Sequence, residues 1–292
     1  MQARRWTTLY RFVNEVAESL PRGSRRFADR VIVLVLLWAA FNHKPISWAV
    51  QRRNWPVWMQ RLLPALPSST TMSRRLRRPS LRLFLDRLLA HAQGPAGLSL
   101  LRIVDGTALE VRSHSKDRQA GYGFGSGRKA KGYKLHLLLE STGQVADWRI
   151  APMNTNEQVM AARMLLHADQ LVYVVADGEY DSNRLHRVVS WKGGQLLAPR
   201  RKTAKNLGHK RHAPGRLRGL SMLEGPSPFG RELLRMRANI ERFFGNADSH
   251  SEALGELPAW VRTHKRVRTW VHAKLTINAV RIRLLREPEV AA

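Results

Sequence analysis

The sequence contains no cysteine, which excludes a disulfide framework, a cysteine-ligated zinc or iron–sulfur site and a thiol nucleophile. It also lacks a long apolar run. The most apolar stretch, residues 31–41, is too short to cross a bilayer, which needs about 20 residues, so it predicts a buried core helix. Motifs for a serine hydrolase or a phosphate-binding loop are absent, and the histidines form no helical pair that suits a zinc hydrolase.

Acidic residues are scarce. The chain has 22 Asp and Glu against 50 Lys and Arg, which gives a formal net charge of +28. So large a positive charge repels itself in a compact protein and is typical of proteins that bind a polyanion, most often nucleic acid. With 292 residues and 43% hydrophobic content, the chain has enough material for one large domain or two ordinary ones.

The order of the elements predicts an α/β fold that follows an all-α N-terminal domain. Residues 1–92 are mostly helical by pattern, and Gly94, Pro95 and Gly97 mark the best domain boundary. The five tryptophans before residue 60 are expected to serve core packing. Strands are then expected at residues 100–111, 132–140, 145–151, 171–176 and 195–198, and helices at 156–169, 182–191, 231–245 and around 260–286. This order is that of a ribonuclease H-like mixed sheet flanked by helices.

Three carboxylates stand out in so basic a chain as candidate functional residues. Each of them also fits an ordinary structural role. Asp105 lies within the first strand and is followed by glycine, so it also fits a hairpin turn. Asp177 closes the fourth strand, where it also suits a helix cap. Glu241 lies on a helix, where it also suits an exposed pair with Arg237 four residues earlier.

Taken together, the three carboxylates predict a cation site. The first and fourth strands of such a sheet would be neighbours, so Asp105 and Asp177 are expected side by side, and a helix across the same edge would add Glu241. Hard divalent ions prefer carboxylate oxygen, and two such ions support in-line phosphoryl displacement.

Three segments carry a resemblance to a known family: Ile103-Val-Asp-Gly-Thr107, Ala176-Asp-Gly-Glu-Tyr-Asp181 and Arg237-Ala-Asn-Ile-Glu-Arg-Phe-Phe-Gly245. They resemble the signature blocks of bacterial insertion-sequence DDE transposases of the insertion-sequence four and five groups. Lys131-Gly-Tyr-Lys-Leu-His136 resembles the second strand of that family. Two positions of the third block depart from the family pattern, where Leu234 replaces a tyrosine and Asp248 a lysine.

The helical pattern and the basic helix near residue 75 lead us to interpret residues 1–92 as a helical DNA-binding domain. The resemblance, which covers about residues 98–285, implies a ribonuclease H-like DDE catalytic domain over 98–286, with a basic insertion at about 200–229. Asp105, Asp177 and Glu241 would be the catalytic ligands of Mg²⁺, or of Mn²⁺ in its place. The expected activity is cleavage at transposon ends and transfer of the 3′-hydroxyl into target DNA. The expected partners are double-stranded DNA (terminal inverted repeats and target) and a second copy in a synaptic homodimer, in the cytoplasm at the bacterial nucleoid and away from membranes.

Basic clusters predict where DNA would bind. A short helix over residues 73–78 is a candidate for a recognition helix or for a phosphate-contacting face, and the glycine-rich loop 113–131 and the segment 200–229 are further candidates. The residues expected to contact DNA are Arg74, Arg75, Arg77, Arg78, Arg128, Lys129, Arg200, Arg201, Lys202, Lys205, Lys210, Arg211 and Arg237.

Two other functions remain open from the sequence. The first is a non-catalytic DNA-binding protein descended from a transposase, which would bind DNA without Mg²⁺-dependent nicking. The second is a basic RNA-binding or ribosome-associated factor. An RNA-binding factor would have base-stacking aromatics among its basic loops, and these loops offer only Tyr122 and Phe124.

Overall fold

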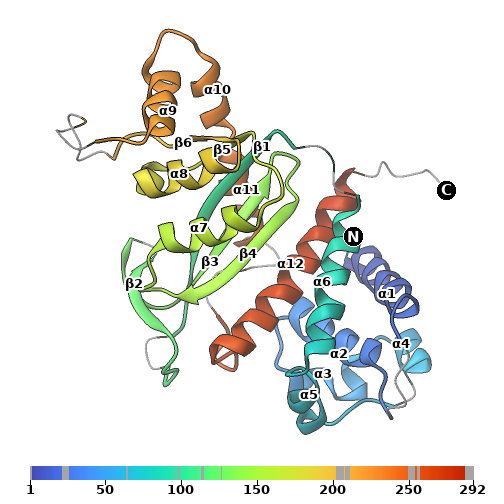
Figure 1. Ribbon diagram of the computed structural model, residues 1–292. Coiled ribbons are helices and arrows are strands. Elements are labelled where there is room, and N and C mark those ends of the chain that lie inside the picture. The colour runs from blue at the N-terminus through green and yellow to red at the C-terminus, as the bar shows by residue number, and fades with distance from the viewer. Residues whose placement is uncertain are drawn as a thin grey trace. The chain divides into compact units, whose positions relative to one another are not determined.

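The computed structural model divides the chain into two compact units (Figure 1). One unit comprises Met1–Ala96 together with Ala247–Ala292, and the other comprises Gly97–Asn246. The structure describes residues 2–21, 26–63, 65–95, 97, 99–112, 115–125, 127–201, 207, 211–248, 254 and 257–286. The division differs from the expected one at the C-terminal end, where the last part of the predicted 98–286 domain joins the helical unit.

The first unit is built from helices around an apolar core. Its elements are α1 (Gln2–Glu18), α2 (Asp29–Phe41), α3 (Ile46–Ala49), the 3-10 helix η1 (Arg52–Asn54), α4 (Val57–Leu62), α5 (Ser69–Arg75), α6 (Pro79–Gln93) and α12 (His264–Arg286). The predicted core helix is confirmed, since residues 32–41 of α2 are all buried. The Trp6 ring packs 4.7 Å from that of Trp38, and the Trp38 ring lies 5.2 Å from that of Trp55. Among the described residues, no helix is long and apolar enough to cross a membrane.

The C-terminal helix α12 belongs to the helical unit, and its middle part is buried there. Residues 270–281 are buried without interruption, and the helix packs against α6, α2 and α1. A helix buried all round occupies the middle of a bundle rather than its surface. The helix was expected from the sequence, but within the catalytic domain, because a local pattern does not encode which unit a helix will join.

The second unit contains a mixed sheet flanked by helices, as predicted. Its strands are β1 (Leu101–Glu110), β2 (Gly121–Gly125), β3 (Arg128–Glu140), β4 (Val145–Pro152), β5 (Tyr173–Val175) and β6 (Gln195–Leu197). The order is β2-β3-β1-β5-β6, and β4 pairs with β3 outside this path. β3 runs antiparallel to β1, β2 and β4, whereas β1, β5 and β6 are parallel. The predicted neighbour relation between the first strand and the strand that precedes Asp177 is therefore confirmed.

The helices of this unit are α7 (Glu157–His167), the 3-10 helix η2 (Gly178–Tyr180), α8 (Asn183–Trp191), α9 (Pro214–Glu224), α10 (Phe229–Arg235) and α11 (Ala238–Asp248). The single helix expected over residues 231–245 is two helices, α10 and α11, separated by Met236 and Arg237. The break places Arg237 immediately before α11.

Helix α9 lies inside the segment 200–229, for which the sequence shows no helical period. The interruption of the pattern comes from glycine, which is a poor helix former. At Gly219 a Cβ atom would lie 2.6 Å from the backbone oxygen of Leu196, so only glycine lets α9 approach β6 this closely. Packing against the sheet therefore overrides the local propensity.

The basic helix expected over residues 73–78 begins earlier and ends at Arg75. Its N-cap is Ser68, whose hydroxyl accepts a hydrogen bond of 3.2 Å from the backbone nitrogen of Thr71. The last part of the predicted segment is instead a turn that leads to Arg78, the N-cap of α6. Arg74 and Arg75 therefore lie on α5, Arg77 lies in the turn and Arg78 caps α6, so these residues do not form one recognition helix.

A buried ion pair joins α9 to the segment that precedes α8. The guanidinium of Arg216 donates two hydrogen bonds to the carboxylate of Asp181, of 2.7 and 2.6 Å, and His186 lies 3.3 Å from the same carboxylate. Burial alone would raise the pKa of Asp181, but the hydrogen bonds from Arg216 and His186 outweigh it and lower the pKa to about 2.

We expect Asp181→Ala to lower the free energy of unfolding by about 3 kcal/mol, because it leaves Arg216 without its partner. The pKa of Asp181 is depressed, so its contribution is complete above its ordinary value of 3.8 and is lost as the pH falls toward 2. Urea unfolding at several pH values measures both effects. The control is Glu224→Ala, which removes an exposed partner of Arg200 and should change stability by less than about 1 kcal/mol. Equal losses for the two variants would contradict the assignment.

Candidate active site

Two aspartates lie just beyond the segment over which the parallel strands β1 and β5 pair. β1 and β5 pair in register at Ile103 and Val175, and Asp105 and Asp177 each lie two residues beyond that pair. Because the strands are parallel, this equal offset brings both side chains to the same edge of the sheet. Asp105 belongs to β1 itself and pairs with Leu137 of β3, so it is not a hairpin turn residue.

Each aspartate also makes a local hydrogen bond to the backbone. The carboxylate of Asp105 accepts a 2.7 Å hydrogen bond from the backbone nitrogen of Gly106. Asp177 is the N-cap of η2 and accepts a 2.8 Å hydrogen bond from the backbone nitrogen of Glu179. The capping role that the sequence left open for Asp177 is therefore real, and it fixes the carboxylate at the end of β5.

Arg237 joins the third carboxylate to the first. One guanidinium nitrogen lies 2.6 Å from the carboxylate of Glu241, and the other lies 3.8 Å from that of Asp105. The pair with Glu241 is the i,i+4 contact that the sequence suggested. The contact with Asp105 brings α11 to the edge of the sheet where the aspartates lie. The glutamate side chain is 54% exposed, whereas that of Asp105 is 16% exposed.

The ionisation of the aspartates reflects this crowding. Burial raises the pKa of Asp105 to about 6; the hydrogen bond from Gly106 and the charge of Arg237 oppose this shift, whereas the charge of Asp177 adds to it. Burial also raises the pKa of Asp177, with a further contribution from the charge of Glu157. The charge of Asp177 thus affects the protonation of Asp105, and the charge of Glu157 affects both aspartates. Such coupling is common where carboxylates share a functional site.

Sequence reasoning missed a fourth carboxylate and its partners. Glu157, the first residue of α7, forms an ion pair with Lys134 of β3 and accepts a 3.1 Å hydrogen bond from the hydroxyl of Tyr180. Burial, followed by the charge of Glu157, raises the pKa of Tyr180 well above its ordinary value. Tyr180 lies inside a signature block, and Lys134 lies inside the segment that resembles the second strand of the family, so their presence there was the signal. No local pattern indicated that Glu157 joins them.

The three carboxylates do not form a preorganised metal-binding site. Within the part of the chain that the structure describes, no group of three or more His, Asp or Glu side chains is placed so as to hold a metal ion. Arg237 instead bridges Asp105 and Glu241. The carboxylates of Asp105, Asp177 and Glu241 still fit a hard divalent cation, because such ions prefer carboxylate oxygens. The pKa values of the two aspartates are raised at this site.

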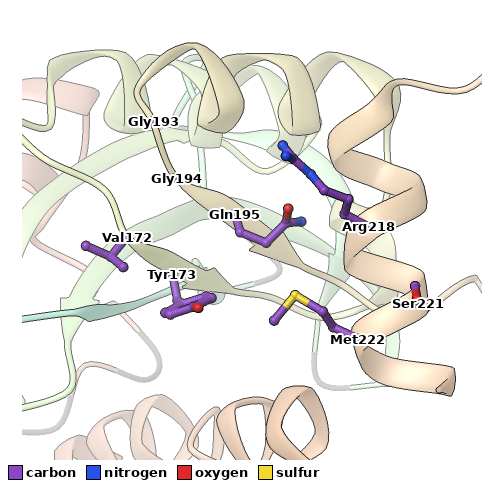
Figure 2. A pocket seen from close by; sticks show the side chains of 8 residues that line it. All are labelled: Val172, Tyr173, Gly193, Gly194, Gln195, Arg218, Ser221 and Met222. Carbon is purple, nitrogen blue, oxygen red and sulfur yellow. The ribbon is translucent and has the colours of Figure 1, made fainter. Parts of the chain in front are cut away.

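A surface pocket lies on another part of this unit (Figure 2). Its lining includes Tyr173 at the start of β5, Gln195 of β6, and Arg218 and Met222, which project from α9. None of the three predicted catalytic carboxylates lines it. The pocket therefore does not belong to the carboxylate site.

The predicted DNA contacts of the helical unit divide into exposed and buried arginines. Arg74 and Arg77 are exposed and Arg78 is half-buried. Arg75 is 4% exposed, forms an ion pair with Asp29 of α2 and donates a 2.8 Å hydrogen bond to the backbone oxygen of Phe27. The prediction that Arg75 contacts DNA is wrong, since its charge is used inside the unit to hold α5 to the start of α2.

Several predicted DNA contacts of the second unit are surface residues with acidic partners. The shortest contacts are 3.2 Å for Arg128 with Glu110, 2.6 Å for Arg200 with Glu224 and 3.5 Å for Arg201 with Glu179. Lys129 and Arg211 are exposed. Lys202, Lys205 and Lys210 lie outside the described residues. Arg237 contacts the carboxylates of Asp105 and Glu241. A contact with DNA stays a prediction for Arg237 and for the exposed basic residues.

Comparison with known proteins identifies the family of the chain. The family model described as the transposase DDE domain matches residues 97–277, which is more than half of the chain. The chain therefore belongs to this family of DDE transposases, which carry out DNA transposition and recombination. None of the curated proteins compared with the chain matches it. Asp105, Asp177 and Glu241 all lie within the matched residues, and the match continues into α12 of the helical unit.

We expect Glu157→Gln to lower the pKa of both Asp105 and Asp177, because the charge of Glu157 raises both. Carbon-13 NMR titration of the aspartate carboxyl groups, in a chelator and without divalent ions, measures the change. Glu224→Gln is the matched control and should leave both values unchanged, since Glu224 is exposed and pairs with Arg200 rather than with the site. An unchanged or raised pKa of Asp105 in Glu157→Gln would show that the carboxylates do not form one electrostatic cluster.

Proposed function

We propose that this chain is an active transposase of the insertion-sequence four and five groups. It cleaves DNA at transposon ends and joins the freed 3′-hydroxyl to target DNA. The observation that carries the proposal is the matched position of Asp105 and Asp177 beyond the β1–β5 pairing, with Glu241 tied to the same edge through Arg237. The family match supports the reaction class.

In this proposal Asp105, Asp177 and Glu241 hold Mg²⁺, or Mn²⁺ in its place. When bound, divalent ions supply the activation of a water or 3′-hydroxyl and the stabilisation of the leaving oxygen. Asp105, with a pKa of about 6, is mostly ionised at neutral pH and so offers its oxygens to a cation. Asp177 is fixed by its hydrogen bond from Glu179, which limits the freedom of its carboxylate.

We propose that Arg237 has one role in the absence of a divalent ion and another in its presence. Without a divalent ion its guanidinium offsets the charges of Asp105 and Glu241. If a divalent ion held these carboxylates, the guanidinium would be free to bind a DNA phosphate, to which a planar arginine side chain can donate two hydrogen bonds. The expected partners are double-stranded DNA, both terminal repeats and target, and a second copy in the synaptic complex.

The central test is nicking of supercoiled plasmid by the full-length protein. We expect nicking that requires Mg²⁺ or Mn²⁺. Asp105→Asn, Asp177→Asn and Glu241→Gln should each slow it at least about 100-fold, since a single interaction that stabilises transition-state charge is worth that much. Glu224→Gln, an exposed acidic residue paired with Arg200, is the control and should nick at the parental rate. Parental nicking by Asp177→Asn would refute the role given to this residue.

The runner-up function is a non-catalytic DNA-binding protein, which the departures at Leu234 and Asp248 favour. It predicts DNA binding that is unaffected by Asp177→Asn and no nicking in any divalent ion. The same plasmid assay, read beside a binding measurement, separates the two functions.

We expect DNA affinity to fall steeply with salt, because a chain with a net charge of +28 should release many counterions from the phosphates it contacts. A protein that neutralises about 6–10 phosphates loses about 10³- to 10⁵-fold in affinity between about 50 and 200 mM salt. Fluorescence anisotropy with a labelled duplex over this range measures the slope. A flat response would contradict the assignment of the exposed basic residues to phosphate contacts.

A further inference from the structure

The hairpin of β2 and β3 carries an aromatic and cationic face. In the register of the two strands, Tyr122 lies opposite Lys131 and Phe124 lies opposite Lys129. Side chains alternate between the faces of a strand, and directly opposed residues of an antiparallel pair share a face. These four side chains therefore form one surface, called here the aromatic–lysine face.

The opposite face of β2 has no side chains, because Gly121, Gly123 and Gly125 alternate with the two aromatics. Close contacts with neighbouring atoms explain why these residues are glycine. A Cβ at Gly123 would lie 2.6 Å from the backbone oxygen of Met153, and one at Gly125 would lie 2.8 Å from the Cβ of Ala108. The glycine face is thus pressed against the rest of the unit, which leaves the aromatic rings on the outer side.

The aromatic rings of Tyr122 and Phe124 are exposed and are not packed into a core. Phe124 is 73% exposed and Tyr122 is 62% exposed. The ammonium group of Lys131 lies 5.8 Å from the centre of the Tyr122 ring and donates a 3.1 Å hydrogen bond to the backbone oxygen of Ser115, which restrains it beside the ring. Lys129 is exposed across from Phe124. An exposed pair of rings beside two cations is typical of a binding surface.

The spacing and charge of the face identify its ligand. Residues i and i+2 of a strand are about 6.6–6.8 Å apart, so two successive unpaired bases of an extended strand can each stack on one ring. The lysines opposite the rings then lie beside the phosphates. A second copy of the same face is a poorer partner, because it would bring lysines against lysines.

We infer that the aromatic–lysine face binds unpaired bases of single-stranded DNA, with Tyr122 and Phe124 as stacking platforms and Lys129 and Lys131 as phosphate contacts. The inference rests on the proposed function only for the source of such a strand, which is DNA opened at a cleaved transposon end. It assigns a substrate feature, the unpaired base, to residues outside the carboxylate site.

The test is the binding of a fluorescently labelled oligothymidylate to the full chain, measured by anisotropy in a chelator at fixed salt. Tyr122→Ala and Phe124→Ala should each weaken binding about 5- to 150-fold, the range for loss of one base–aromatic stack. Tyr122→Phe and Phe124→Tyr should retain the affinity, whereas Phe124→Leu should not. The aromatic variants should keep the parental salt slope, and Lys129→Ala should reduce it by about 0.7.

Trp191→Ala is the matched control, because Trp191 is also an exposed ring, at 75%, with the ammonium group of Lys192 5.8 Å from its centre. It lies at the end of α8, and its alanine variant should bind oligothymidylate with parental affinity. Thermal unfolding of every variant should be parental, since the replaced side chains are exposed. This check separates loss of stacking from loss of folding.

Two results would overturn the inference. Parental affinity of Tyr122→Ala and Phe124→Ala would show that no base stacks there. A change of oligomeric state in these variants, seen by sedimentation with unchanged DNA affinity, would make the face an interface between copies instead. Oligothymidylate binding is measured without divalent ions, so it is independent of the nicking assay. Either experiment can therefore contradict its own proposal without affecting the other.

Discussion

The contacts of Arg237 with Asp105 and Glu241 join the end of the sheet to the start of α11, and the arrangement of the candidate site depends on them. Burial is the main reason that the pKa values of Asp105 and Asp177 are raised, and repulsion from neighbouring carboxylates adds to it. One guanidinium offsets part of that charge within the protein. A divalent cation would offset more of it, and this is the physical link between the observed geometry and metal-dependent phosphoryl transfer.

The mixed sheet gives the site its position. The parallel pairing of β1 with β5 carries Asp105 and Asp177 to one edge, and the antiparallel β3 brings Lys134, with its ion pair to Glu157. The break between α10 and α11 leaves Arg237 at the first turn of the helix that supplies Glu241. The site is therefore assembled from segments far apart in the sequence, each held by regular structure.

Much of the second unit was predictable because its local signals agree with its tertiary structure. The apolar run before Asp177 indicated a buried strand, and β5 forms there, beside β1, as the predicted fold requires. The convergence of Asp105 with Asp177 followed from that neighbour relation. The pairing of Glu241 with Arg237 followed from helical spacing alone.

The remaining features depend on contacts that local patterns do not encode. The three glycines made β2 resemble a loop, although close packing against Met153 and Ala108 requires them. The joining of α12 to the helical unit depends on burial along residues 270–281, and the burial of Arg75 depends on Asp29 of another helix. Glu157 enters the site only because α7 begins beside β3. In each case the deciding partner is distant in the sequence.

The most direct measurement is the position of Mn²⁺ by anomalous diffraction from crystals of the full chain soaked in the ion. The account predicts a peak within about 2.0–2.3 Å of carboxylate oxygens from both Asp105 and Asp177, with the guanidinium of Arg237 displaced from Asp105. Crystals saturated with Mn²⁺ that show no peak at either aspartate, and Arg237 still between Asp105 and Glu241, would contradict it.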